Sequence, residues 1–171
     1  MRWIALALAF FALSVSAQPA KPFFLDEEYE AKPWKEIESQ LPPFPTPGKL
    51  LKFPVTPSNF DFFIDADSLS VGSDGVVRFS LVARSASGAE NITFEGMRCF
   101  TGERRTYAFG HSDKTWSKAR SNKWAAIGSA NRSPQFATLW NDFFCPAGFI
   151  IANPKEGLDA LRWGAHPKAR P

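Results

Sequence analysis

The first seventeen residues limit the possible fold most strongly, because they predict which part of the chain folds and in which compartment. Arg2 gives a positive start, the run from Trp3 to Val15 is apolar and uncharged, and small residues end it at Ala17. This pattern is typical of a secretory signal peptide, residues 1–17. The apolar run is shorter than the roughly 20 residues that a spanning helix needs. We therefore expect an exported chain that is not an integral membrane protein.

The two cysteines, Cys99 and Cys145, are expected to form a structural disulfide, because an even pair in an oxidising compartment is most simply bonded. They lack the CxxC spacing of a redox pair. With only two histidines in the chain, metal-ligand spacing is also missing. We expect neither a metal nor another cofactor.

Residues 18–57 predict a proline-rich, acidic arm. Nine prolines in this stretch argue against a continuous helix or a central strand. One short helix at 34–40 is left open, with Pro33 in its first turn. Between residues 26 and 38 most of the charged side chains of the arm are acidic: Asp26, Glu27, Glu28, Glu30, Glu36 and Glu38, against Lys32 and Lys35. We expect the arm to be extended and partly ordered.

The following residues, 58–164, have the pattern of one domain that opens with β-strands. After a strand at 60–65, a three-residue loop with a left-handed Gly75 would place Val71 opposite Val77. That register gathers the apolar side chains, including Phe79, on one face.

The next strand, 91–100, carries apolar residues whose spacing breaks strict alternation. A bulge at Gly96 would bring Ile92, Phe94, Met97 and Cys99 to one face. Counting through the turn at 101–103 then pairs Met97 with Tyr107 and adds Tyr107 and Phe109 to the core.

Two helices are predicted after the strands. The first, 133–145, has Pro134 in its first position and an apolar stripe that includes Trp140. We expect Trp140 to be buried against the sheet near Phe79, Leu81 and Phe94. The second begins after Asn153 with a capping box and ends at Gly164. Residues 165–171, with His166, read as a loose, solvated tail. The predicted fold is α+β: an antiparallel meander of about five strands packed against one C-terminal helix.

Five short segments carry a family resemblance: FFIDADSL at 62–69, MRC at 97–99, RRTY at 104–107, WAAI at 124–127 and FFC at 143–145. Over roughly residues 28–162 the chain resembles the CNP1-like family of exported β-proteobacterial proteins. More distantly it resembles the surface-adhesin E proteins, which implies an antiparallel sheet packed on one helix and binding of host ligands. The adhesin precursors resemble lipoproteins with a cysteine at the cleavage site. Because position 18 is Gln here, we expect no lipid anchor and a soluble periplasmic protein.

The stretch from Arg98 to Arg132 is the candidate binding region, with eight basic residues, two acids and interleaved tryptophans. Such a composition is used for nucleic-acid binding, but export argues against that partner. An anionic envelope glycan, a lipid phosphate or an acidic protein would be the equivalent target. A solvated face neutralised by the acidic arm is the alternative. The candidate patch is Arg104, Trp116, Lys118, Arg120 and Lys123.

No catalytic residues are predicted. The neighbours His111, Ser112 and Asp113 have the residue types of a triad, but triad members meet from separate segments. The sequence therefore predicts a non-enzymatic, exported envelope protein that acts as a binding module. An adhesin-like binder of host or matrix ligands is the first alternative. An envelope enzyme is the second, which a deep polar cleft containing His111 would favour.

Overall fold

The computed structural model describes residues 33–121, 123–128 and 133–169. The predicted signal peptide and residues 18–32 of the arm lie outside the described residues. The compact unit that holds the fold begins at Trp34. Within the part of the chain that the structure describes, none of the helices has the length and apolar character needed to cross a bilayer.

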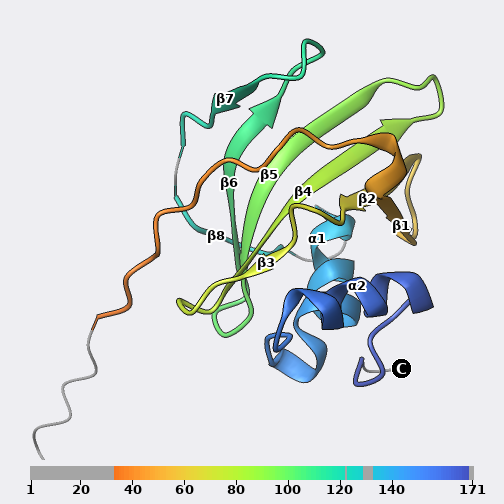
Figure 1. Ribbon diagram of the computed structural model, residues 1–171. Coiled ribbons are helices and arrows are strands. Elements are labelled where there is room, and N and C mark those ends of the chain that lie inside the picture. The colour runs from red at the N-terminus through yellow and green to blue at the C-terminus, as the bar shows by residue number, and fades with distance from the viewer. Residues whose placement is uncertain (1–32, 122, 129–132, 170–171) are drawn as a thin grey trace, which may run out of the picture. The chain divides into compact units, whose positions relative to one another are not determined.

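The fold is α+β, as predicted, with one antiparallel sheet (Figure 1). The sheet has eight strands where about five were predicted, in the order β1-β2-β4-β5-β6-β7, with β3 beside β4 and β8 beside β6. The strands are β1 (Leu50–Phe53), β2 (Phe60–Asp65), β3 (Ser70–Val71), β4 (Val76–Ser85), β5 (Glu90–Arg98), β6 (Glu103–Gly110), β7 (Trp116–Lys118) and β8 (Ala125–Ala126). The additional strands are short or lie at the sheet's edges, where periodicity gives the weakest signal.

The predicted hairpin register is confirmed at β3 and β4. Val71 pairs with Val77, and Gly75 has a φ of 77°, the left-handed conformation that the three-residue loop requires. Val77, Phe79 and Leu81 then lie on one face and belong to the main core. The alternating side chains of β4, among them Val76 and Val82, are also buried, so this strand is covered on both faces.

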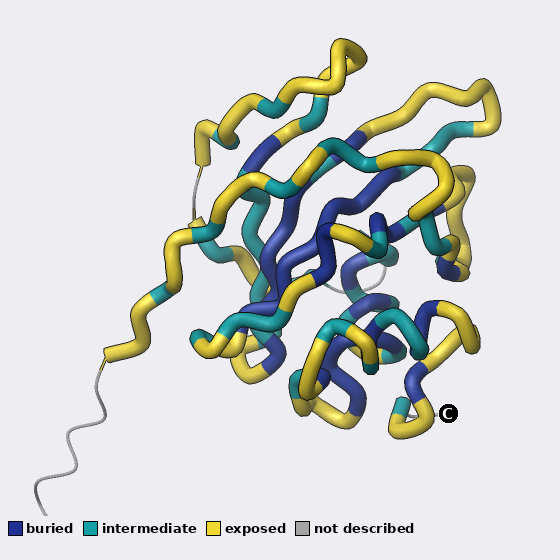
Figure 2. The backbone as a smooth tube through the Cα atoms, viewed as in Figure 1, coloured by how far each residue is buried: buried dark blue, intermediate teal, exposed yellow. Residues whose placement is uncertain are grey.

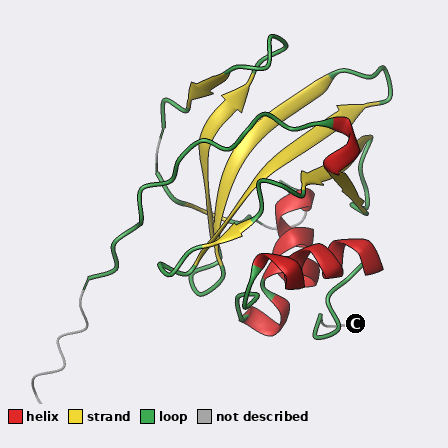
Figure 3. Cartoon of the chain, viewed as in Figure 1, coloured by secondary structure: helices red, strands yellow, loops and turns green. Residues whose placement is uncertain are grey.

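Helical segments cover one face of the sheet (Figure 3). They are α1 (Pro134–Thr138), the π-helix η2 (Leu139–Phe144), the 3-10 helix η3 (Pro146–Gly148) and α2 (Pro154–Trp163); a further 3-10 helix, η1 (Pro47–Lys49), precedes β1. The predicted 133–145 helix is thus present as α1 continuing into η2. At α2 the predicted cap is confirmed, because Asn153 accepts a hydrogen bond from the Glu156 amide and Gly164 ends the helix with a φ of 86°.

The helix-covered face contains the disulfide between Cys99 and Cys145, which joins the end of η2 to the residue after β5. Trp140 is only half-buried, and its indole N–H donates to the Cys99 carbonyl at 3.3 Å. The expectation that Trp140 packs close to Phe94 was wrong, because Phe94 lies on the opposite face of the sheet.

The bulge between β5 and β6 differs from the prediction. Pairing shifts between Phe94 and Glu95, where Phe94 pairs with Ala108 and Glu95 with Thr106, so the extra residue is Tyr107 on β6. The predicted bulge at Gly96 and the Met97–Tyr107 pair were therefore wrong. Without a bulge in β5, its apolar residues remain divided between the two faces.

The arm explains why both faces are buried. It crosses the face opposite the helices, over β5 and β6, and the strands between the two layers are dark in the burial view (Figures 1 and 2). Phe44 of the arm packs on Trp116, whose ring lies 6.4 Å from that of Phe94. Residues 33–46 of the described arm have neither helix nor strand, so the helix left open at 34–40 does not form. The arm's last part forms η1 and β1.

In the described part of the tail after α2, His166 is buried, which corrects the prediction that it is solvated, whereas Ala165, Pro167 and Lys168 are exposed. His166 is only 6% exposed. Its ring Nε2 lies 2.8 Å from a carboxylate oxygen of Glu156, and its amide donates to the Asp142 carbonyl. A lone polar residue near a chain end gave no sequence signal for these non-local contacts.

Candidate functional site

Four of the five predicted patch residues line one cavity of about 460 Å³: Arg104, Lys118, Arg120 and Lys123. We call this cavity the basic pocket. Pairing of Ala108 with Lys118 places β7 alongside the end of β6. Pairing of Arg104 with Ala125 then places β8 alongside the beginning of β6. The two strand contacts therefore draw a scattered set of cations to one edge of the sheet.

The cations of the basic pocket differ in how they are paired. Among the described residues, Lys118, Arg120 and Lys123 form no ion pair. Arg104 is already engaged: its Nη1 lies 3.7 Å from a Glu95 carboxylate oxygen and its guanidinium lies 4.2 Å from the centre of the Phe136 ring. Phe109, 43% exposed, adds an apolar wall to the pocket.

Phe109 is a correction to the predicted core. The extra residue at Tyr107 places Ala108 in the buried position beside Phe94 and leaves Phe109, which pairs with Thr93 and Ser117, on the other face of β6 and partly exposed. The side chain therefore lines the pocket and does not pack in the interior.

Trp116 does not join the basic pocket. It lies on the arm-covered face, half-buried, with its ring 5.2 Å from that of Phe44, and its indole N–H donates to the Pro42 carbonyl. Its role in this structure is to hold the arm on the sheet.

Glu95 lies behind the basic pocket and is 2% exposed. Burial raises its pKa to about 7, against the opposing effects of the Arg104 charge and hydrogen bonds from Thr93 and Thr106. The Thr106 hydroxyl is 3.0 Å from the carboxylate oxygens. Arg104 thus contacts a carboxyl group that takes up a proton near neutral pH.

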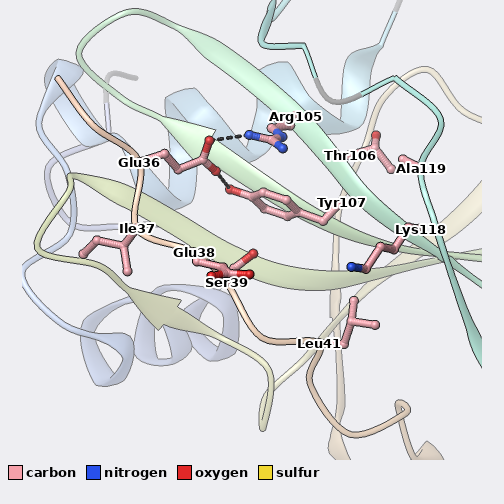
Figure 4. A pocket seen from close by; sticks show the side chains of 10 residues that line it. All are labelled: Glu36, Ile37, Glu38, Ser39, Leu41, Arg105, Thr106, Tyr107, Lys118 and Ala119. Carbon is pink, nitrogen blue, oxygen red and sulfur yellow. Dashed lines mark hydrogen bonds and ion pairs between the residues drawn. The ribbon is translucent and has the colours of Figure 1, made fainter. Parts of the chain in front are cut away.

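A second cluster of cations lies on the arm-covered face, around the carboxylate of Glu36. Glu36 accepts hydrogen bonds from the Arg105 guanidinium and from the Tyr107 hydroxyl at 2.6 Å (Figure 4). It also accepts one from the Trp124 indole at 3.1 Å, and Arg78 is 3.8 Å away. The prediction that Arg105 and Tyr107 share a face is confirmed. That face, however, is covered by the arm and not by the helices.

The space between arm and sheet is a cavity of about 430 Å³, which we call the arm groove (Figure 4). Arm residues form one wall and residues of β6 and β7 form the other: Glu36, Ile37, Glu38, Ser39 and Leu41 against Arg105, Thr106, Tyr107, Lys118 and Ala119. The composition of the arm and of the basic stretch indicated, as the alternative, that the two neutralise each other. It carried no signal that Glu36 would contact Arg78, Arg105, Tyr107 and Trp124.

Burial and hydrogen bonding shift the pKa values of two ionisable groups at the arm groove, Tyr107 and Asp74. Burial and the hydrogen bond to Glu36 raise the pKa of the Tyr107 hydroxyl, so it remains a donor. Burial alone would raise the pKa of Asp74, but hydrogen bonds from Arg78 and the Ile37 amide lower it. Asp74 is therefore an anion that fixes Arg78 beside Glu36.

The three adjacent residues of the triad type do not converge. His111 Nε2 lies 2.8 Å from the Ser117 hydroxyl, while Asp113 accepts from the amide and hydroxyl of Thr115. His111 and Ser112 line a cavity of about 500 Å³ between the arm and the loop after β4. Within the described parts of the chain, no group of three or more His, Cys, Asp or Glu side chains has the arrangement of a metal site.

Together, the fold and its surfaces define a disulfide-bonded α+β protein with a single antiparallel sheet and two cation-lined cavities beside β6. The model of the CNP1-like family matches residues 29–162, so the chain belongs to this family and the predicted resemblance is confirmed. It is similar to "Cryptic neisserial protein 1" of Neisseria gonorrhoeae, with 28% identity over 146 residues that span 71% of this chain and 68% of that protein. No solved structure matches the chain at a significant level.

Proposed function

We propose that this CNP1-like protein is a non-enzymatic, exported binding module of the cell envelope, and that its basic pocket binds an anionic ligand. The observation that carries the proposal is the convergence of Arg104, Lys118, Arg120 and Lys123 on one cavity. Three of these cations lack an ion-pair partner among the described residues. Convergent cations without a nearby acid attract an anion from solution.

The shape of the pocket favours a compact anionic group. A cavity of about 460 Å³ is within the range of sites that enclose small ligands. Phosphate and carboxylate groups accept hydrogen bonds from arginine in a bidentate geometry, and lysines add point charges. An envelope glycan or a lipid headgroup carries such groups, and Phe109 offers a surface for the sugar or glycerol part.

Binding to two model polyanions tests the proposal: polygalacturonate for a glycan, and vesicles containing phosphatidylglycerol for a lipid phosphate. Simultaneous Lys118→Ala, Arg120→Ala and Lys123→Ala substitutions should abolish binding without lowering the melting temperature. Wild-type binding should weaken steeply with salt, because exposed charges are screened beyond about 8 Å at physiological ionic strength.

The matched control removes the same number of charges elsewhere. Lys49, Lys52 and Lys155 are exposed and lie away from the pocket, paired with surface carboxylates. If substituting these three lysines with alanine weakens binding equally, attraction depends on net charge and the pocket has no special role. Failure of the wild-type protein to bind either polyanion would also reject the proposal.

Export is tested separately. Expression of the full chain in a Gram-negative host should release, in the periplasmic fraction, a protein whose intact mass corresponds to cleavage after Ala17. Retention of residues 1–17, or recovery only in the cytoplasm, would contradict the exported location.

A further inference from the structure

The arm groove, taken from here on to include the surface on which residues 34–38 lie, holds this segment as a protein would hold an extended peptide. Sheet side chains contact the arm's backbone: Arg78 donates to the Ile37 carbonyl at 3.0 Å, and Asp74 accepts from the Ile37 amide at 2.9 Å. The Trp34 indole N–H donates to the Asp74 carbonyl at 2.8 Å. Main-chain contacts combined with side-chain pockets are the usual elements of peptide recognition.

Two side chains of the arm fill specific positions in the groove. The Trp34 ring lies under the Arg98 guanidinium, 3.8 Å from its centre, and meets Trp124 edge-on at 5.9 Å. Two residues later, Glu36 takes the position where Arg105, Tyr107 and Trp124 converge. The recognised pattern is therefore an aromatic residue, any residue, and a carboxylate in an extended backbone.

The arm fits this groove incompletely. Trp34 is 43% exposed and Ile37 is 47% exposed, so their side chains are not part of the core. The Nε atoms of Arg78 and Arg105 are buried and donate to no acceptor among the described residues. Arg78 itself has a side chain only 7% exposed. The groove thus holds more donors than one arm carboxylate satisfies.

We propose that the arm groove is a binding site for an extended acidic segment of another protein, and that residues 34–38 occupy it as an intramolecular competitor. A partner segment with the same aromatic and carboxylate spacing would replace Trp34 and Glu36. The arm would remain attached through Pro42 and Phe44, which contact Trp116 further along the sheet. This proposal concerns a different ligand from that of the basic pocket, although Arg105, Thr106, Lys118 and Ala119 line both cavities.

The test uses the full mature chain and a fluorescein-labelled peptide with the sequence of residues 33–40, PWKEIESQ. Glu36→Gln weakens the internal occupant while preserving its shape. An internal competitor acts at an effective concentration in the millimolar range. We therefore expect the Glu36→Gln protein to bind the peptide at least about tenfold more tightly than the wild type.

Three controls make the result specific. Glu90→Gln removes the same charge at an exposed position outside the groove, and should behave as the wild type. A peptide with Gln in place of its first Glu should not bind. Adding Arg105→Gln to the Glu36→Gln protein should abolish binding, because the carboxylate then loses its guanidinium partner.

A second variant keeps the test valid if the Glu36→Gln protein does not fold. Trp34→Ala removes the other anchor and should also strengthen peptide binding. Equal peptide affinity for the wild type, Glu90→Gln and both arm variants would overturn the proposal, as would undetectable binding to all of them.

Two further outcomes would assign the groove to another ligand and overturn the proposal as well. A dimer of the arm variants that the peptide dissociates, measured by sedimentation, would make a second copy of this chain the occupant. Displacement of the peptide by free galacturonate or inorganic phosphate at concentrations similar to the peptide's own would indicate a small-anion site.

Discussion

At the scale of single residues, Glu95 shows how a buried acid can remain in a sheet. It lies on β5 between Phe79 and Thr106 in the strand register, where strict alternation would favour an apolar side chain. A buried charge is costly unless it is paired, and here hydrogen bonds and Arg104 compensate only part of the desolvation. The folded protein therefore favours the protonated carboxyl group.

Glu95→Gln should become more stable relative to the wild type as the pH rises from about 5 to about 8. The pKa of the Glu95 carboxyl is raised from its ordinary value of 4.5 to about 7 in the folded state. Between these two pH values the folded state therefore binds more protons than the unfolded state. The wild type then loses stability up to about pH 7, by roughly 3 kcal/mol at most for a shift of this size.

Urea unfolding of both proteins at several pH values measures this difference. Glu90→Gln, at an exposed position on the same strand, is the control and should show little change with pH. Parallel stability curves for Glu95→Gln and the wild type would mean that Glu95 is ionised throughout.

At the scale of elements, α2 shows that helix propensity and packing can oppose each other. Its cap at Asn153 and its end at Gly164 follow local rules that the sequence makes visible. Gly157, within the helix, breaks those rules, because glycine is a poor helix former. A Cβ there would lie 2.7 Å from Ile151 Cδ1 and 3.0 Å from Leu69 Cδ2, so the residue permits a close approach of α2 to the core.

Gly157→Ala should destabilise the protein by up to about 2 kcal/mol. Alanine improves helix propensity by about 1 kcal/mol, but overpacking a tight core costs roughly 1–3 kcal/mol. Lys155→Ala, an exposed position in the same helix, should stay within about 0.5 kcal/mol of the wild type. Denaturant unfolding of both variants and the wild type measures these changes in the free energy of unfolding. A more stable Gly157→Ala protein would show that the Ile151 side chain can move aside.

At the scale of the whole molecule, one sheet supports two packed layers. The helices and the disulfide cover one face, and the arm covers the other, where Phe44 lies over Ile92, Gly110 and Trp116. The buried residues of β4 and β5 on that second face, such as Val82 and Phe94, depend on the arm for their cover. The arm is thus part of the folded structure at 42–44, although it contains no helix or strand there.

Phe44→Ala should therefore lower the free energy of unfolding of the entire domain by about 1–2 kcal/mol, less than the 3–5 kcal/mol typical of a fully buried phenylalanine. Near-ultraviolet and far-ultraviolet circular dichroism should report one shared transition. Leu41→Ala, an exposed arm position, should have a smaller effect. If Phe44→Ala changes only the near-ultraviolet signal, then the arm detaches independently of the sheet.

The sequence by itself determined the features that depend on neighbours along the chain: the Gly75 loop with its Val71–Val77 pair, the start of α1 at Pro134, the cap of α2, the α+β class and the family resemblance. Alternation of side chains also placed Arg104 and Arg105 on opposite faces, since that follows from strand geometry alone. The clustering of Arg104, Lys118, Arg120 and Lys123 was proposed on charge and composition.

Only the tertiary structure decided what covers each face, because a period of two gives the side on which a residue lies but not the layer that packs there. If only one face of the sheet were buried, the apolar residues of β5 would need a bulge to reach that face, which is why a bulge was predicted. Because both faces are buried, these residues can lie on either face without one. The arm groove had no local signal, since Glu36 and Trp124 are 88 residues apart in sequence. Their contact exists because packing of Phe44 on Trp116 brings the arm across the sheet.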